Sequence, residues 1–112
     1  MEILFKNRRL EKVCTRQRQL VKQWPLERTK RIRRRLDDLR AAENLDVMRF
    51  LPGRCHELRK IRGLQLSLNL DGPNRLIFEP ADNPLPVKMD GGLDWCEVRV
   101  VRILGVEDTH GS

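Results

Sequence analysis

The spacing of apolar residues changes halfway along this chain of 112 residues, and that change limits the folds available to it. Between residues 8 and 40, apolar side chains recur every three or four positions, the period of a helix packed on one side. From residue 54 onward the period is two, as in strands with one buried face. With a short apolar strand at residues 2–5, the pattern predicts one α+β domain over residues 1–112, its helices packed on a small, mainly antiparallel sheet.

Two helices are expected in the first half. Asn7 is a candidate N-cap for the first helix, and Pro25 ends that helix and can open the second. The second helix has an apolar stripe of Ile32, Leu36 and Leu39, and arginine and lysine cover most of its other faces. A tight turn between two such helices predicts an antiparallel helical hairpin.

The second half has the pattern of a meander of strands. Alternation and β-branched runs predict strands at residues 55–58, 64–70, 75–79 and 98–106. Asn44 is expected to cap a short turn before the first of them. In residues 64–70 the leucines should face the helices, while Gln65, Ser67 and Asn69 should stay in water. The stretch before the last strand is rich in Pro, Gly and Asp, which favours a long surface loop.

Charge is distributed unevenly along the chain. Residues 1–62 hold 19 Lys and Arg against 8 Asp and Glu, a net charge of +11, whereas residues 63–112 carry −4. A basic half favours a polyanionic partner, because neutralising phosphates releases counterions. A merely solubilising surface is the alternative, but this excess is larger than solubility needs. Nucleic acid or the ribosome is therefore the favoured partner class.

The cysteines and the apolar runs exclude several other classes. Cys14, Cys55 and Cys96 are scattered without a C-x-x-C pair, so we expect reduced thiols and no zinc site. The sequence also lacks an acidic cluster suited to Mg²⁺, so no metal or cofactor is expected. No apolar run approaches the roughly 20 residues of a membrane span, and no secretory leader is recognisable. A cytoplasmic location without a membrane partner is the expectation.

A few polar side chains could cleave RNA without a metal. That reaction needs a base for the 2′-hydroxyl, a cation for the phosphorane and an acid for the leaving 5′-oxygen. The two histidines, His56 and His110, flank the meander; Asp108 lies beside His110, and Arg75 follows a turn where its guanidinium can donate twice to a phosphate. Each of these residues is also compatible with an ordinary hydrated surface, so spacing alone leaves both interpretations open.

Three segments, in order, resemble the HigB branch of the RelE/ParE toxins, the plasmid maintenance killer proteins. RCHEL at 54–58 resembles a basic-x-His-x-Leu element, RLIFEP at 75–80 an arginine-containing strand, and EDTH at 107–110 an ending that carries Asp and His. The resemblance implies a RelE-like fold with two N-terminal helices. It assigns catalytic roles to His56, Arg75, Asp108 and His110, and RNA-binding roles to Arg54, Lys60, Arg62 and Asn74.

The resemblance implies a toxin of a type II toxin–antitoxin system, an mRNA interferase that cleaves mRNA on the ribosome and inhibits translation. Asp108 or His110 would take the 2′-hydroxyl proton, and His56 or His110 would protonate the leaving oxygen. Arg75, with Arg62 or Arg54, would stabilise the phosphorane. The implied partners are the ribosome, mRNA and a HigA-type helix-turn-helix antitoxin, with DNA bound only through the antitoxin.

The chain departs from the family pattern in its aromatic residues. It contains no tyrosine, and Asn74 and Thr109 stand where the family has aromatic side chains able to stack on a base. This departure keeps two alternatives open: a non-catalytic toxin of the same fold that blocks gyrase or the ribosome, and a plain RNA- or ribosome-binding module. If the target is the ribosome, the basic helix between Arg28 and Arg40 is expected to dock on ribosomal RNA through phosphate contacts that do not read sequence.

Overall fold

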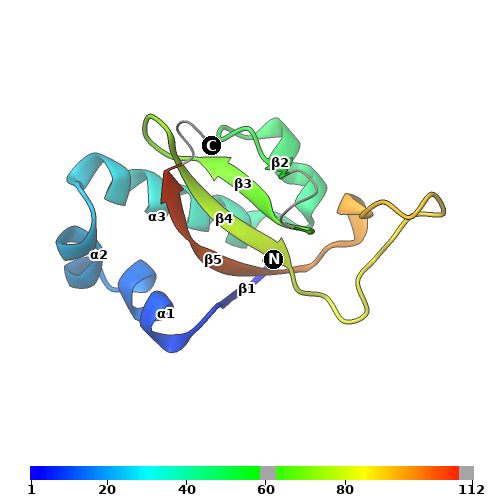
Figure 1. The fold of residues 1–112 in the computed structure, drawn as a ribbon, viewed down its shortest axis with the longest axis horizontal. Helices are drawn as coiled ribbons and strands as arrows, with labels where there is room; N and C mark the ends of the chain where they lie inside the picture. Colours follow the sequence, from blue (N-terminus) through cyan, green and yellow to red (C-terminus); the bar gives the residue numbers. More distant parts are fainter. Residues whose placement is uncertain (59–62, 109–112) are drawn as a thin grey trace.

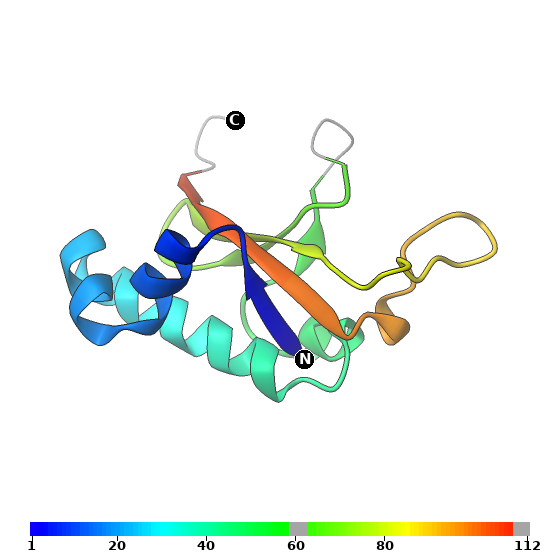
Figure 2. The same ribbon diagram turned by 90° about the horizontal axis from the view of Figure 1, so that it is seen from below.

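The computed structural model describes residues 1–58 and 63–108, and these form a curved sheet with a long helix against one face (Figures 1 and 2). The elements in chain order are β1 (Glu2–Phe5), α1 (Arg8–Thr15), α2 (Gln17–Gln23), α3 (Leu26–Ala41), the 3-10 helix η1 (Leu45–Phe50), β2 (His56–Glu57), β3 (Leu66–Asn69), β4 (Asn74–Pro80), the 3-10 helix η3 (Trp95–Glu97) and β5 (Val100–Asp108). The expected α+β class is confirmed.

The sheet is mixed. In the described part of the chain its five strands lie in the order β1-β5-β4-β3-β2. β1 pairs in parallel with β5, from Glu2 opposite Val100 to Phe5 opposite Ile103, and the other three pairings are antiparallel. The first and last strands are therefore neighbours, and the antiparallel meander extends from β5 to the edge formed by β2.

The first helical segment differs from the expected single helix, because an extended residue, Arg16, divides it into α1 and α2. Asn7 caps α1 as predicted, with its Oδ1 accepting from the Leu10 amide at 2.8 Å. Cys14 and Leu20 are both buried. At about 100° per residue they would lie about 120° apart on one continuous helix, so the break lets both residues face the core.

α3 supplies the main helical contact to the sheet. Pro25 stands just before its first turn, and the predicted stripe of Ile32, Leu36 and Leu39 is buried. The α-amino group of Met1 donates to backbone carbonyls in the last turn of α3 and just beyond it, which places β1 beside that end of the helix.

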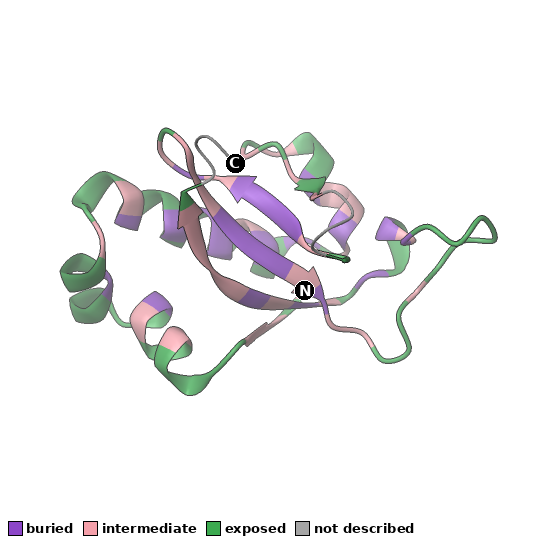
Figure 3. Ribbon diagram, viewed as in Figure 1, coloured by how far each residue is buried: buried purple, intermediate pink, exposed green. Residues whose placement is uncertain are grey.

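The apolar residues predicted to face the helices lie in the core beneath the sheet, but β3 and β4 each bury three consecutive residues, so both of their faces are covered at the centre (Figure 3). Leu66 and Leu68 of β3 pack there with Leu76 and Phe78 of β4. The expectation for the polar residues of β3 is wrong at Ser67, which is 1% exposed. Its hydroxyl lies beside the His56 ring of the neighbouring strand, and that contact shields it from water.

The segment between β4 and β5 is a long loop, as predicted, and it is anchored at both ends. An isolated bridge joins Val87 to Leu93, and Leu93 and Trp95 are buried. The Asp82 carboxylate accepts from the amide of Arg99, which ties the loop to the start of β5. Among the described helices, none combines the length and the apolar character needed to cross a bilayer.

Candidate active site on the open face of the sheet

The cross-strand register shows which predicted site residues share a face. His56 lies opposite Ser67, and Ser67 lies opposite Ile77. Arg75, two residues before Ile77, lies opposite Glu107. Directly paired residues point to the same side of an antiparallel sheet, and side chains alternate along each strand. His56 and Arg75 therefore project from the face opposite the buried leucines.

His56 and Arg75 are separated by two strand spacings and one two-residue step along the strand. With strands about 4.8 Å apart and a rise of about 3.3 Å per residue, their Cα atoms lie about 12 Å apart. His56 stands on the edge strand β2, and Arg75 stands on the central strand β4. Ser67 and Ile77 lie between them on this face and are 1% and 0% exposed, so the centre of the face is covered and His56 and Arg75 stand at its two ends.

The imidazole of His56 is exposed and held by its backbone. Its Nδ1 lies 2.8 Å from the carbonyl oxygen of Arg54, and because that oxygen only accepts, Nδ1 carries the hydrogen. Nε2 is then the atom that gains or loses a proton, and it lies 3.4 Å from the Ser67 hydroxyl. The bond from Nδ1 to the backbone fixes the orientation of the ring and therefore the position of Nε2.

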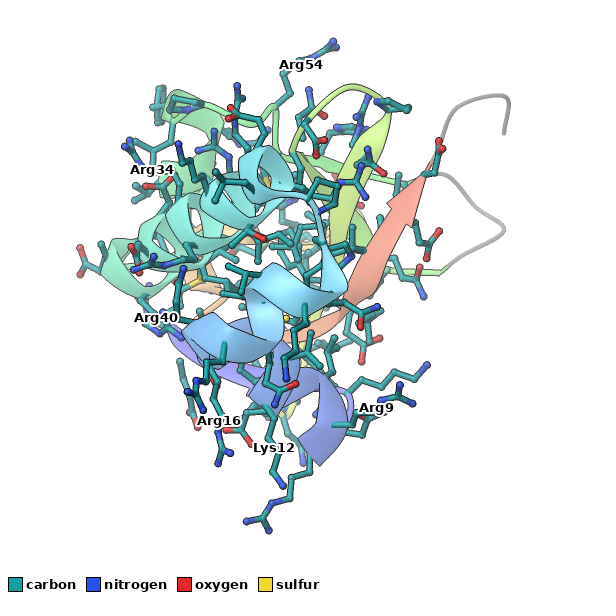
Figure 4. The ribbon with its side chains drawn as sticks, turned by 90° about the vertical axis from the view of Figure 1, so that its left-hand side faces the viewer. Arg9, Lys12, Arg16, Arg34, Arg40 and Arg54 are labelled. Atoms are coloured by element: carbon teal, nitrogen blue, oxygen red, sulfur yellow. The ribbon has the colours of Figure 1, made fainter. Side chains whose placement is uncertain are left out.

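The carbonyl that holds His56 is placed by an unusual stretch of backbone. Gly53 has φ +114° and Arg54 has φ +47°, so two consecutive residues are left-handed. A non-glycine residue there costs about 1–2 kcal/mol. The Gly53 carbonyl also accepts from the Asn69 amide at 2.7 Å, which anchors the bend to β3. The Arg54 side chain is exposed, and Figure 4 shows it at an outer rim of the molecule.

Arg75 is half-buried and partly engaged. Its Nη1 donates to the carbonyls of Gly72 at 2.8 Å and Asn74 at 3.1 Å, within the turn that precedes β4. These bonds hold the guanidinium at that end of the face and leave its Nε and Nη2 edge outside the turn contacts. The Asn74 side chain donates to the Asp71 carbonyl at 3.0 Å, so it closes the same turn.

The carboxylates at the end of β5 are divided between the two faces. Asp108 lies opposite Asn74, so alternation places it on the opposite side of the sheet from Arg75. Glu107 lies on the side of Arg75 and directly opposite it. Glu107 was not among the predicted site residues. Alternation from the core-facing Val106 would have assigned Glu107 to the same face as Arg75.

Three predicted residues, Lys60, Arg62 and His110, lie outside the described residues, so the structure does not place them. His56, Arg54 and Arg75 are brought to one side of the sheet or its rim, and Asn74 and Asp108 are not. Within residues 1–58 and 63–108, no three His, Cys, Asp or Glu side chains gather as metal ligands.

The cations of α3 are only partly neutralised within the protein, because Lys30, Arg33 and Arg34 have no carboxylate partner among the described residues. Four of its arginines have carboxylate partners: Arg28–Asp71, Arg31–Glu27, Arg35–Asp38 and Arg40–Asp37. Lys30 and Arg34 are exposed and border a hollow of about 270 Å³ beside Arg31 and Arg35. The expected docking helix therefore offers fewer available charges than its composition indicates.

The three thiols are free, and none is arranged as a nucleophile. Burial raises the pKa of Cys14 to about 11. Burial also raises the pKa of Cys55 to about 12, against a smaller opposing effect of Arg49. Both therefore remain protonated at neutral pH and are poor metal ligands. Cys96 is exposed on η3.

Known proteins do not identify this arrangement: neither a scan of protein-family models nor a search of curated proteins finds a match to the chain.

Proposed function

We propose that this protein is a toxin of a type II toxin–antitoxin system that cleaves ribosome-bound mRNA without a metal, using the open face of the sheet. The HigB-like elements around His56 and Arg75 support this proposal, as does their placement on one face about 12 Å apart. The observation that carries it is the exposed His56 ring, whose Nδ1 lies 2.8 Å from the Arg54 carbonyl oxygen and whose Nε2 lies 3.4 Å from the Ser67 hydroxyl.

The proposed reaction is an in-line attack of the 2′-oxygen on phosphorus. The 2′-hydroxyl loses its proton to a base, the P–O bond to the 5′-oxygen breaks, and that oxygen receives a proton from an acid. His56 carries one of these two protons at Nε2. Glu107, which lies opposite Arg75 on that face, or His110 carries the other. Arg75 donates from its Nε and Nη2 edge to the phosphorane oxygens.

A ribosome-dependent cleavage assay tests the proposal. Purified ribosomes carrying a defined mRNA are incubated with the protein, and primer extension locates the cleavage sites. Loss of the His56 ring in His56→Gln should lower the rate about 100- to 10,000-fold, the range typical of a proton-transfer group. Arg75→Lys keeps the charge but loses the planar double donor, and should lower the rate about 100-fold or more.

The matched control is Arg102→Lys. Arg102 also stands on a strand, paired with Glu79 at 2.8 Å, and its lysine variant keeps that charge pair. The control should cleave at the wild-type rate, and all variants should unfold at the wild-type temperature. Wild-type cleavage by both His56→Gln and Arg75→Lys would remove the assigned site.

A non-catalytic toxin of the same fold is the second candidate. The observation that favours it is the engagement of Arg75 and Asn74 with their own turn, which holds both side chains as structural groups. In that case induction of the protein arrests growth while cellular mRNA stays intact, and His56→Gln arrests growth equally well. Absence of growth arrest would instead favour a plain RNA- or ribosome-binding module.

A further inference from the structure

We propose that the arm formed by α1 and α2, residues 6–23, is a docking surface for the phosphate backbone of double-helical RNA. This extends the proposed function by locating the ribosomal RNA interface, and the choice of RNA rests on that function. From the sequence alone α3 was the expected docking helix. Four of its arginines are paired with carboxylates, so the preceding helices, α1 and α2, offer more available cations.

All the basic residues of the arm lack a described carboxylate partner, whereas four of the seven on α3 have one. Seven exposed basic residues lie in it: Lys6, Arg8, Arg9, Lys12, Arg16, Arg18 and Lys22. Its sequence holds one acidic residue, Glu11. None of the seven basic side chains forms an ion pair with a described carboxylate. Seven basic residues and one acidic residue give these 18 residues a net charge of +6. This excess is larger than solubility requires, so it favours an anionic partner.

The cations are ordered as well as numerous. Arg9 and Lys12 are three residues apart on α1, so they lie on one side of that helix, and Arg16 is the extended residue that follows its last turn. Figure 4 shows these three side chains reaching away from the body of the molecule. In Figures 1 and 2 the two short helices stand beyond one end of the sheet, where an extended ligand can approach them without touching the open face.

The chemistry of the arm favours binding to the backbone over base recognition. The aromatic residues that adjoin it, Phe5 and Trp24, are both partly buried against the core and give no exposed platform for stacking an unpaired base. Glutamines lie between the cations, and side-chain amides of this kind donate hydrogen bonds to phosphate and sugar oxygens. An acidic protein is disfavoured, because protein interfaces usually have an apolar centre, whereas Val21 is the one exposed large apolar residue of the arm.

The test measures binding of a fluorescein-labelled RNA hairpin by anisotropy at several KCl concentrations. The arm variant carries Arg9→Ala, Lys12→Ala and Arg16→Ala. The control variant carries Arg31→Ala, Arg40→Ala and Lys88→Ala, which also removes two arginines and one lysine from exposed sites. Each control residue, however, has a carboxylate partner. The two variants have the same net charge, so only the location of the charges differs.

The arm variant should bind at least about tenfold more weakly at 100 mM KCl, and its slope of log K against log salt should fall by about one for each phosphate that is no longer neutralised. The control variant should change the slope by less than one. Equal losses of affinity in both variants would overturn the proposal, since net charge alone would then explain binding. Stronger binding to a DNA duplex of the same sequence would overturn the choice of RNA.

A charge reversal guards against a folding defect in the triple variant. Lys12→Glu alone should lower affinity more than Lys88→Glu, with both unfolding at the wild-type temperature. The arm variant keeps His56 and Arg75, so hairpin binding tests the docking surface and mRNA cleavage tests the proposed nuclease site. Arm-dependent binding without any cleavage would refute the nuclease proposal alone, and cleavage with arm-independent binding would refute the docking surface alone.

Discussion

Replacing Gly53 by alanine should destabilise the protein more than the backbone angle alone requires. Gly53 has φ +114°, a conformation that residues with a Cβ atom rarely adopt. An added Cβ would also lie 3.1 Å from Arg35 Nε and 3.1 Å from Leu68 Cδ2. The Arg35 side chain is only 7% exposed and is bonded to Asp38, so it has little freedom to retreat.

The expected cost follows from these two effects. The left-handed backbone contributes about 1–2 kcal/mol, and displacing the packed Arg35 and Leu68 side chains adds about 1 kcal/mol. For 112 residues, an unfolding entropy of about 2.1 cal/mol/K per residue converts each kcal/mol into about 4 °C. A total of about 2–3 kcal/mol therefore lowers the melting temperature by about 8–12 °C.

Gly91→Ala is the matched control. Gly91 has φ +93°, and an added Cβ there meets no atom within 4 Å. It shares the backbone strain, and the same entropic restriction of the unfolded chain, but not the collision. Thermal unfolding followed by circular dichroism, with urea titration for the free energies, should show a loss of about 1–2 kcal/mol for this variant.

The comparison decides whether close packing at Gly53 matters. If the unfolding free energy of Gly53→Ala is no lower than that of Gly91→Ala, the close approach of Gly53 to Arg35 does not affect stability and the prediction is wrong. If the prediction holds, the bend that presents the Arg54 carbonyl to His56 is maintained by packing against α3.

Three further predictions concern capping and the thiols. Asn7→Ala removes the acceptor for the Leu10 amide and should cost about 1 kcal/mol in urea unfolding, whereas Asn7→Asp should not; equal losses would contradict capping. Iodoacetamide should alkylate exposed Cys96 before Cys14 in the native protein, and mass spectrometry finding the reverse order would refute the assigned burial. Burial raises the pKa of Cys14 to about 11 and of Cys55 to about 12 from 9.0, so the folded state keeps these protons longer. The unfolding free energy should therefore lose this contribution as pH rises from 9 through 11–12, less steeply in Cys55→Ala, and an identical slope would contradict it.

Local patterns were sufficient for most elements of the fold. Asn7 and Asn44 were recognised as caps because an Asn side chain can satisfy a free amide at a helix start, whatever the tertiary context. The leucines of β3 were assigned to the core because alternation commits each strand to one buried face. The division of the first helix at Arg16 was missed, since no proline or glycine marks it and it arises from how the segment packs.

The candidate site was predictable only in part. The approach of His56 and Arg75 follows from strand pairing, which a meander favours but whose register no single residue specifies. The separation of Asp108 from Arg75 depends on a register shift in the pairing of β4 with β5, between Ile77 and Phe78. The shift offsets the pairing by one residue, so Asp108 lies on the opposite face from the one that an unbroken register would give it. The positions of Lys60, Arg62 and His110 stay predictions.

The amino-acid sequence by itself determined the class of the fold, the apolar strand residues that face the helices, and the excess of positive charge in the first half, because these depend on residue type and spacing along the chain. The tertiary structure decided which charges remain available. Carboxylates distant in sequence or one turn away neutralise most arginines of α3, and no described carboxylate pairs with the cations of the arm. Electrostatic attraction acts through space, so composition counts the charges but only the folded arrangement shows which of them can bind a partner.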